Sequence, residues 1–323
     1  MMPSKHAMQK RIFQLPPVVY MLLILIVGFS FASDRFLSLS NFSNILLQAS
    51  PLLILAFGQT LVVLSQGTDL SVGAQISFVT VIWMLMARAG IPLVPAAGFA
   101  VCSTCLIGAL NGLVVAKGAI PPFIATFGMQ SVLSGVSLLL SGSASVTYRS
   151  NFYIIVMEST LFGIRFPIYL AVGIFVATWI LLYRTRFGTN VFGLGGNPEA
   201  LALAGVNTTH VYIKVYLYAG LLAGIAGILT GCRIESGHPT VGVGLEFESI
   251  AATLLGGTSL REGKGSLKNT IYGVLFLAVM KNGLNLTGIS AVYQSLIIGL
   301  IMLFALVIDA LIRRVRQNME EAQ

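Results

Sequence analysis

Residues 45–66 read ILLQASPLLILAFGQTLVVLSQ and contain no charged side chain. An α-helix needs about 20 mainly apolar residues to cross the hydrocarbon core of a lipid bilayer. This stretch is long enough, and similar stretches precede and follow it. The sequence therefore predicts an all-α protein that crosses a membrane many times.

The chain contains about ten candidate spans of this length and character. They lie at residues 17–33, 45–66, 71–88, 93–116, 121–141, 167–183, 213–232, 241–258, 267–284 and 291–312. Polar residues and glycines interrupt the third and the eighth span. Each of these two is therefore open to a second interpretation as a broken or re-entrant helix.

The composition excludes the other large classes of protein. Of the 323 residues, 56% are hydrophobic and 9% are charged, against about 25% charged residues in an ordinary soluble domain. Disordered chains show the opposite balance, and three cysteines are too few for a disulfide scaffold. The net charge of +8 does not indicate nucleic-acid binding, because the basic residues are scattered between apolar runs.

The basic residues also indicate the orientation, since Lys and Arg collect in cytoplasmic loops. With the N-terminus inside, 13 of the 19 Lys and Arg are cytoplasmic, and the external ones are Arg35, Arg88, Arg149, Arg165, Arg233 and Lys281. We therefore expect a cytoplasmic segment 1–16, a single transmembrane domain 17–312 and a cytoplasmic tail 313–323. The start of the chain also resembles a cleavable signal peptide, but its apolar run is long for one.

No sequence motif predicts an enzyme, a cofactor or a metal site. The nearest match to a phosphate-binding loop, residues 258–265, lacks the leading Gly and the Ser or Thr after Lys264. Cys102 and Cys105 stand in an apolar helix with no second pair, and the three histidines are far apart in the sequence. No nucleophile, base and orienting group can be combined into a catalytic set.

Glycines spaced four apart predict close helix packing. The pairs are Gly108 with Gly112, Gly220 with Gly224, and Gly227 with Gly231. Each pair lies on one helix face and lets another backbone approach. We expect these contacts to lie within the chain, with dimerisation as the alternative.

Uncharged amides inside the spans favour a neutral, polyhydroxylated solute, because amides both donate and accept hydrogen bonds. The candidate pathway residues are Gln59, Gln130, Asn282, Asn285 and Gln294. Asn111 is set aside because it lies near a glycine packing face. The alternative for each amide is an ordinary hydrogen bond between helices.

Acidic residues fall mostly in loops or at span ends, which argues against a proton- or sodium-coupled carrier. Glu246 and Glu248 are the exceptions, because they open the eighth apolar segment. A structural role at a helix start and a functional role both remain open for them.

The loop 184–212 is long and contains signals for a short helix of its own. Asn197 can cap the helix, Pro198 suits its first position and Gly205 suits its end. A short capped helix in a cytoplasmic loop is a common docking element.

Three segments, taken in order, resemble the ribose-type sugar permeases of bacterial ATP-binding-cassette importers. They are GTDLSVG at 67–73, GGNPEA at 195–200 followed by Gly205 and Val206, and a block that runs from Glu246 to Gln294. Two departures put partner specificity in question. Ala202 replaces a customary Arg, and Arg261-Glu262 stands where a Gly pair is common.

The resemblance implies a permease fold of the ribose/branched-chain amino acid type in the bacterial inner membrane. A periplasmic binding protein would deliver a neutral monosaccharide, two permease subunits in a homodimer or heterodimer would form the pathway, and cytoplasmic ATPase subunits would supply the energy. The loop would contact the ATPase through Gly195, Gly196, Asn197, Pro198, Glu199, Ala200, Leu203 and Gly205.

The family-motif residues Asp69, Ser71, Glu246 and Glu248 are expected to have structural or gating roles. For Asp69 the first interpretation is a helix cap at the cytoplasmic surface and the second is a re-entrant gate. The rival function is an ion-coupled secondary sugar carrier without an ATPase, in which Glu246 or Glu248 would reach the substrate cavity. A channel or structural scaffold has no selectivity-filter pattern in its favour.

Overall fold

The computed structural model describes residues 16–118, 120–260, 262–290, 293–294, 296–300, 303–304 and 307. Its helices are α2 (Pro17–Ala32), α3 (Leu39–Leu64), α4 (Ser71–Arg88), α5 (Leu93–Gly118), α6 (Pro122–Ser141), α7 (Phe152–Glu158), α8 (Phe166–Arg184), α9 (Arg186–Gly196), α10 (Pro198–Leu203), α11 (Thr208–Ile234), α12 (Leu245–Leu255) and α13 (Leu267–Leu286). Its strands are β1 (Val146–Thr147), β2 (Thr160–Leu161), β3 (Ile164–Arg165) and β4 (Ser236–Gly237). Strand β1 pairs antiparallel with β4, and β2 pairs antiparallel with β3.

Short polar side chains fix where several helices begin. The side chains of Ser38, Thr185, Asn197 and Asn207 accept a hydrogen bond from a backbone amide in the first turn of α3, α9, α10 and α11, respectively. Such caps satisfy amides that have no partner inside the helix. Local sequence therefore specifies these helix starts without the need for a tertiary contact.

Among the described residues, six helices are long and apolar enough to cross a membrane: α3, α4, α5, α6, α8 and α11. The third predicted span is the unbroken 18-residue helix α4. The eighth is broken, because α12 has 11 residues and is only about 16 Å long. The tenth lies mostly outside the described residues, so the number ten stays a prediction.

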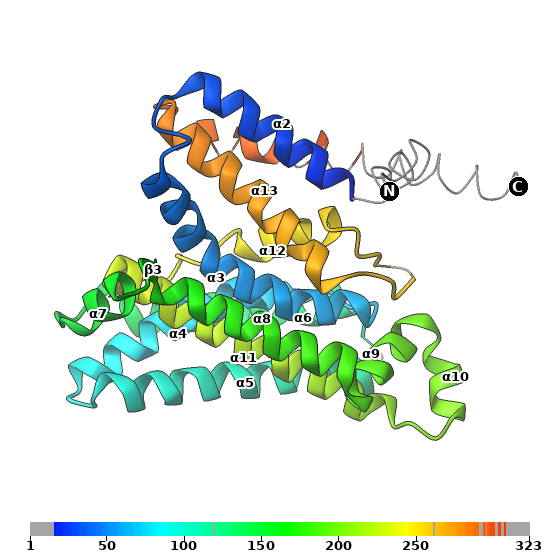
Figure 1. Cartoon of the computed structure of the whole chain (residues 1–323). Coiled ribbons are helices and arrows are strands. Elements are labelled where there is room, and N and C mark those ends of the chain that lie inside the picture. The colour runs from blue at the N-terminus through cyan, green and yellow to red at the C-terminus, as the bar shows by residue number, and fades with distance from the viewer. Residues whose placement is uncertain are drawn as a thin grey trace, which may run out of the picture.

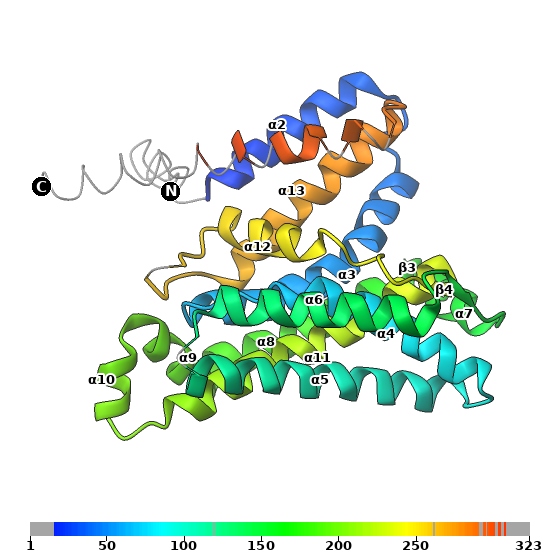
Figure 2. The ribbon, with the colours of Figure 1, turned by 180° about the vertical axis from the view of Figure 1, so that it is seen from behind.

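The helices form two groups joined by α3. Helices α4, α5, α6, α8 and α11 lie together, α2, α12 and α13 form the second group, and α3 contacts members of both (Figures 1 and 2). Helix α7 and the short strands lie at one end of the molecule, and α9 and α10 lie at the opposite end. The 184–212 loop and the segment 142–166 thus lie at opposite ends of the molecule.

Glycines let α5 and α11 approach closely. A methyl group added to Gly108 would overlap the carbonyl oxygen of Tyr216, and one added to Gly220 would overlap that of Thr104. Further along α11, Gly227 and Gly231 lie against Val79 and Trp83 of α4. The prediction that these glycines pack helices within the chain is confirmed.

Burial separates central from peripheral helices. In α3, α4 and α11, 72–78% of the most apolar stretch is buried, whereas the values for α5, α6 and α8 are 17–33%. The peripheral helices expose large apolar side chains such as Leu106, Leu139 and Val172. Apolar residues outside and polar residues inside are typical of a protein whose solvent is lipid.

Candidate functional site

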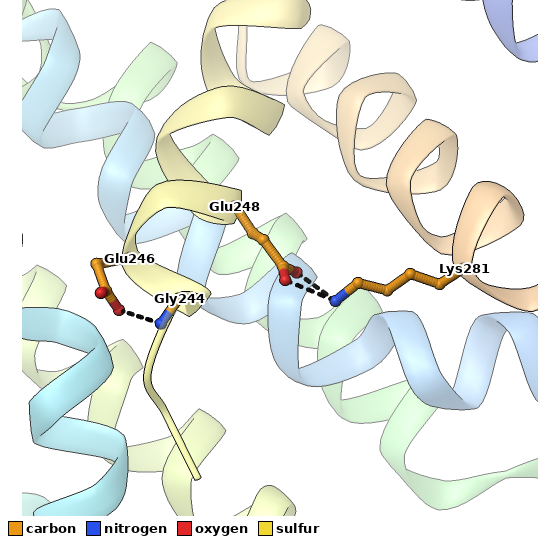
Figure 3. Close-up of polar contacts among 4 residues, drawn as sticks. All are labelled: Gly244, Glu246, Glu248 and Lys281. Atoms are coloured by element: carbon orange, nitrogen blue, oxygen red, sulfur yellow. Dashed lines mark hydrogen bonds and ion pairs between the residues drawn. The ribbon is translucent and has the colours of Figure 1, made fainter. Parts of the chain in front are cut away.

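The first turn of α12 carries two glutamates that point in opposite directions. Gly244 precedes the helix with a φ of 91°, a left-handed conformation that favours glycine. Figure 3 shows Glu246 on one side, where it accepts a hydrogen bond of 3.1 Å from the Gly244 amide, and Glu248 on the other side. Side chains two positions apart in sequence point about 200° apart around the helix axis, which explains why Glu246 and Glu248 diverge.

Glu248 forms an ion pair with Lys281 between α12 and α13. The Nζ of Lys281 lies 2.7 Å and 2.6 Å from the two carboxylate oxygens. The side chains are 17% exposed for Glu248 and 35% exposed for Lys281. Lys281 lies inside α13, near its C-terminal end, and its place among the external charges stays a prediction.

The ion pair lines a cavity of about 630 Å³. Helices α3, α11, α12 and α13 and the described residues near 294–299 form its walls, and its polar lining is Gln48, Thr230, Arg233, Glu248, Lys281, Asn285 and Gln294. The volume falls in the range of about 300–1,000 Å³ that is usual for small-molecule sites. A solute of this size could meet donors, acceptors and both signs of charge here.

Two of the five predicted pathway amides lie on this cavity. Asn285 and Gln294 both line it, and the Nε2 of Gln294 donates to the Oδ1 of Asn285 over 2.8 Å. Both groups keep further hydrogen-bonding capacity, because an amide has several donor and acceptor positions.

The other three predicted pathway amides lie elsewhere. Gln59 is fully buried in α3, and neither of its side-chain polar atoms has a hydrogen-bond partner among the described residues. Gln130 donates to the Oε1 of Glu246 over 3.1 Å. Asn282 exchanges two hydrogen bonds, of 2.8 Å and 2.9 Å, with Asn41. These contacts join helices, which is the alternative that the sequence left open.

Asp69 is the centre of an enclosed polar cluster between α3 and α4. Its Oδ1 accepts hydrogen bonds from the Ser71 amide over 2.9 Å and from the Ser71 hydroxyl over 2.6 Å. The amides of Gln75 and Asn111 each donate to the Ser71 oxygen over 2.8 Å. The contact to the Ser71 amide lies at the start of α4, but the residue that caps this helix is Leu70, so the predicted capping role of Asp69 stays a prediction. The carboxylate is fully buried, however, and not at a surface.

Burial alters the chemistry of Asp69, which lies in the connection outside both neighbouring spans. Loss of hydration raises the pKa of its carboxyl from 3.8 to about 6, although the hydrogen bonds from Ser71 and Asn111 oppose the shift. Its Oδ2 has no hydrogen-bond partner among the described residues. The cluster therefore holds a carboxyl group whose charge is only partly compensated.

Glu246 packs against α4 beside this cluster. A methyl group added to Gly73 would overlap a carboxylate oxygen of Glu246, so the two helices touch at this point. With Gln130 of α6 also bonded to it, Glu246 links three helices. Glu246 is buried, whereas Glu248 faces the cavity.

The predicted short helix in the 184–212 loop is confirmed as α10. The Oδ1 of Asn197 accepts a hydrogen bond of 2.9 Å from the Ala200 amide, Pro198 occupies the first turn, and Gly205 has a φ of 83° after the helix. No residue of α10 is buried, and Leu203 is 90% exposed. An apolar side chain so exposed at the end of the molecule is available to a partner.

The sequence matches one protein family along most of its length. Residues 41–306 match the family described as branched-chain amino acid transport system / permease component. The chain belongs to this permease family. No solved structure shows a significant match to it.

Named relatives cover nearly the whole chain. Ribose import permease protein RbsC of Escherichia coli strain K12 is 37% identical over 292 residues, which are 89% of this chain and 91% of that protein. The galactose/methyl galactoside import permease protein MglC of Haemophilus influenzae is 35% identical over 314 residues, covering 91% and 93%. The D-allose transport system permease protein AlsC of Escherichia coli K12 is 29% identical over 297 residues, covering 91% of both chains.

These matches confirm the resemblance to ribose-type sugar permeases. They also confirm that the chain is a transporter subunit and not an enzyme, and that it is a multi-pass membrane protein. They argue against the rival ion-coupled carrier. Glu248 does reach the cavity, as that rival predicts, but Lys281 neutralises it.

Sequence reasoning missed several residues that line the cavity. Gln48, Arg233 and Lys281 were not singled out as pathway residues, although all three line it. A signal existed for Lys281, because a charge inside a predicted span is a functional candidate by default. A signal existed for Gln48 too, because it is an amide inside the predicted span 45–66, as Gln59 is. Arg233 lies just after a predicted span and carries no comparable signal.

Proposed function

We propose that this chain is the membrane-spanning permease subunit of an ATP-driven importer for a neutral monosaccharide, ribose or a similar sugar. The observation that carries the proposal is 37% identity to a ribose import permease over 89% of the chain. The galactoside and allose relatives support a sugar as the substrate class without selecting one sugar.

The cavity at Glu248 and Lys281 is the proposed sugar pathway. A monosaccharide presents hydroxyl groups that donate and accept, and Asn285, Gln294 and the ion pair offer both functions. Gln59, Gln130 and Asn282 stay in the proposal as residues near the pathway. The contacts that Gln130 and Asn282 make between helices would have to change during transport. Asp69, Ser71 and Glu246 would hold the adjacent helices in place.

The proposed partners follow from the same assignment. A periplasmic binding protein would deliver the sugar, a second permease subunit would complete the pathway, and a cytoplasmic ATPase would bind α10. The proposal places the chain in the bacterial inner membrane with segments 1–16 and 313–323 in the cytoplasm, and it treats 17–312 as one domain. The distribution of Lys and Arg supports this orientation.

Reconstituted transport tests the function. The chain would be placed in proteoliposomes with and without its ATPase and binding protein, and uptake of a labelled sugar panel measured with ATP or with an ion gradient alone. We expect uptake that needs both partners and ATP. Uptake by the chain alone on an ion gradient would overturn the proposal.

The exposed apolar side chain of α10 gives a sharper test. We expect Leu203→Asp to reduce ATP-driven uptake by about tenfold or more, because a charge there would be desolvated in an apolar contact. Leu203→Ile keeps the apolar side chain and is the control. Unchanged uptake in the Asp variant, at equal protein stability, would count against α10 as the contact.

A further inference from the structure

A three-way contact joins the 184–212 loop to the cavity walls. We name it the cytoplasmic joint and define it as residues 64–66 at the end of α3, Gly195 of α9 and Gly263 in the connection between α12 and α13. Its parts are far apart in sequence and meet at the end of the molecule where α9 and α10 lie (Figures 1 and 2).

The backbones at the joint are in direct contact. A methyl group added to Gly195 would overlap the carbonyl oxygen of Leu64 and come within 2.7 Å of the Cα of Gly263. A methyl group added to Gly263 would overlap the backbone carbonyl group of Gly195. Only glycine fits at both positions, so α9 cannot move without displacing both neighbours.

The side chain of Gln66 forms a hydrogen bond across the joint, and its backbone is strained. Its Nε2 donates to the Gly195 carbonyl oxygen over 2.6 Å. Its φ is 58°, a left-handed value that is unfavourable for a residue with a side chain. The other described residues of this kind besides glycine are Ser143, Phe162 and Glu235, all near the opposite end. Strained backbone of this type is often retained where it has a function.

The joint is continuous with α10. Leu201 of α10 packs on α9, where a methyl group added to Gly193 would lie 2.9 Å from its Cδ1. Gly193 is two residues from Gly195. Movement of α10 therefore reaches the joint through one packed contact and about half a turn of helix.

Beyond the joint lie two walls of the cavity. Helix α3 connects the joint to the cavity, since Gln48 and Leu55 of this helix line the cavity. The length of helix from Leu64 to Gln48 is about 24 Å. Pro51, which also lines the cavity, interrupts the hydrogen bonds of α3 and is a natural point of bending.

On the other side, α12 and α13 are packed as one unit. A methyl group added to Gly256 would lie 2.7 Å from the backbone of Asn269, and one added to Gly273 would overlap the carbonyl oxygen of Ala252. The Ser259 amide donates to the Lys264 carbonyl oxygen over 2.8 Å and closes the turn that carries Gly263. Displacing Gly263 would therefore move Glu248 and Lys281 together.

We infer that Gln66, Gly195 and Gly263 are positioning residues that transmit movement of α10 to the two cavity walls formed by α3 and by the α12–α13 unit. This inference rests on the proposed function, since it assumes that a partner moves α10. It adds the residues through which that movement reaches the pathway.

The experiment measures sugar transported per ATP hydrolysed in the fully assembled importer. Gln66→Met is expected to lower this ratio by about tenfold, while assembly with the ATPase and the rate of ATP hydrolysis stay within about twofold of the wild type. Gly195→Ala is expected to lower the ratio in the molecules that assemble. Gln66→Asn, which keeps an amide and tolerates a left-handed backbone, should recover part of the ratio. Gly173→Ala is the matched control, because nothing lies within 4 Å of the added methyl group.

A purely structural role would lower thermal stability and assembly without changing the ratio in the molecules that do assemble. A wild-type ratio in both Gln66→Met and Gly195→Ala would overturn the inference. If Gly195→Ala does not fold, Gln66→Met decides alone, because it leaves the glycine contacts intact. Failure of the proposed function would be seen separately, as wild-type uptake that is independent of ATP.

Discussion

Asp69 and Glu248 are two carboxylates in the same membrane protein, and they are accommodated in opposite ways. Asp69 is fully enclosed, and its hydrogen-bond donors are neutral groups of Ser71. Glu248 is partly exposed on a cavity, and its partner is the cation Lys281. One carboxylate is enclosed by the fold and the other lines a cavity.

The different surroundings of Asp69 and Glu248 predict different effects when each is changed. An enclosed carboxylate with incomplete hydrogen bonding makes folding depend on its protonation. An ion pair at the edge of a cavity keeps its charges compensated until a solute offers replacement hydrogen bonds. Changes near Asp69 should therefore affect folding, whereas changes near Glu248 should affect transport.

The largest effect is expected from pH at Asp69. Burial raises its pKa from 3.8 to about 6, so the folded protein binds this proton more tightly than the unfolded chain. The group therefore favours folding most below about pH 4, and this contribution is lost as the pH rises through about 6. Relative to Asp69→Asn, the unfolding free energy of the wild type should fall by about 2–3 kcal/mol between pH 4 and pH 8.

Thermal unfolding of both proteins in one detergent, over a series of pH values, measures this difference. The Asn side chain can itself change the unfolding free energy, but that change is the same at every pH. It therefore does not affect how the difference between the two proteins varies with pH. The phenol of Tyr216, which donates to the Thr68 carbonyl oxygen beside Asp69, is present in both proteins. A difference that stays constant from pH 4 to pH 8 would show that Asp69 does not hold its proton as its burial predicts.

The next effect is expected at the amide pair of Asn41 and Asn282. Asn282→Leu would remove two hydrogen bonds and leave the buried Asn41 amide without that partner. We expect a loss of about 2 kcal/mol in unfolding free energy, and recovery of most of it in the double variant with Asn41→Leu. Uptake per folded molecule should stay close to the wild type. A specific loss of uptake in the double variant would instead place Asn282 in the pathway.

The partners of the amides inside the spans could not be predicted from the sequence. Gln59, Gln130, Asn282, Asn285 and Gln294 look alike in the sequence, since each is an amide in an apolar span. Only the packing of helices distant in the chain determines that two line the cavity and that Asn282 meets a residue 241 positions away. One sequence contains no signal for such a pairing.

Features that depend on neighbouring residues were predictable. Asn197 and Pro198 start α10 where the sequence placed a short helix, because a cap acts within one turn. The spacing of Gly108 and Gly112 predicted a close helix contact, although not that Tyr216 and Ile213 of α11 would provide it. The cytoplasmic joint could not be predicted, because it forms from three loops and helix ends that meet only in the folded chain.

The smallest of the three effects, and the most specific to transport, is expected at Lys281. Lys281→Met leaves the Glu248 carboxylate on the cavity without its cation, so the pathway gains an uncompensated negative charge. Because both side chains are partly exposed, water replaces some of the lost interaction and stability should change by less than about 1 kcal/mol. Uptake of the sugar should fall by about tenfold, which corresponds to about 1.4 kcal/mol.

Two further variants test whether the unpaired charge of Glu248 causes the loss of uptake. One is a control on the same helix, and the other also removes the charge of Glu248. Lys268→Met removes an exposed Lys at the start of α13 and should leave both uptake and stability unaltered. The double variant Glu248→Gln with Lys281→Met removes both charges and should recover part of the uptake, because a neutral amide still binds hydroxyl groups. If uptake stays low in the double variant, the ammonium group itself contacts the sugar. If Lys281→Met unfolds the protein but transports normally when folded, the ion pair belongs with Asp69 among the groups that hold the fold.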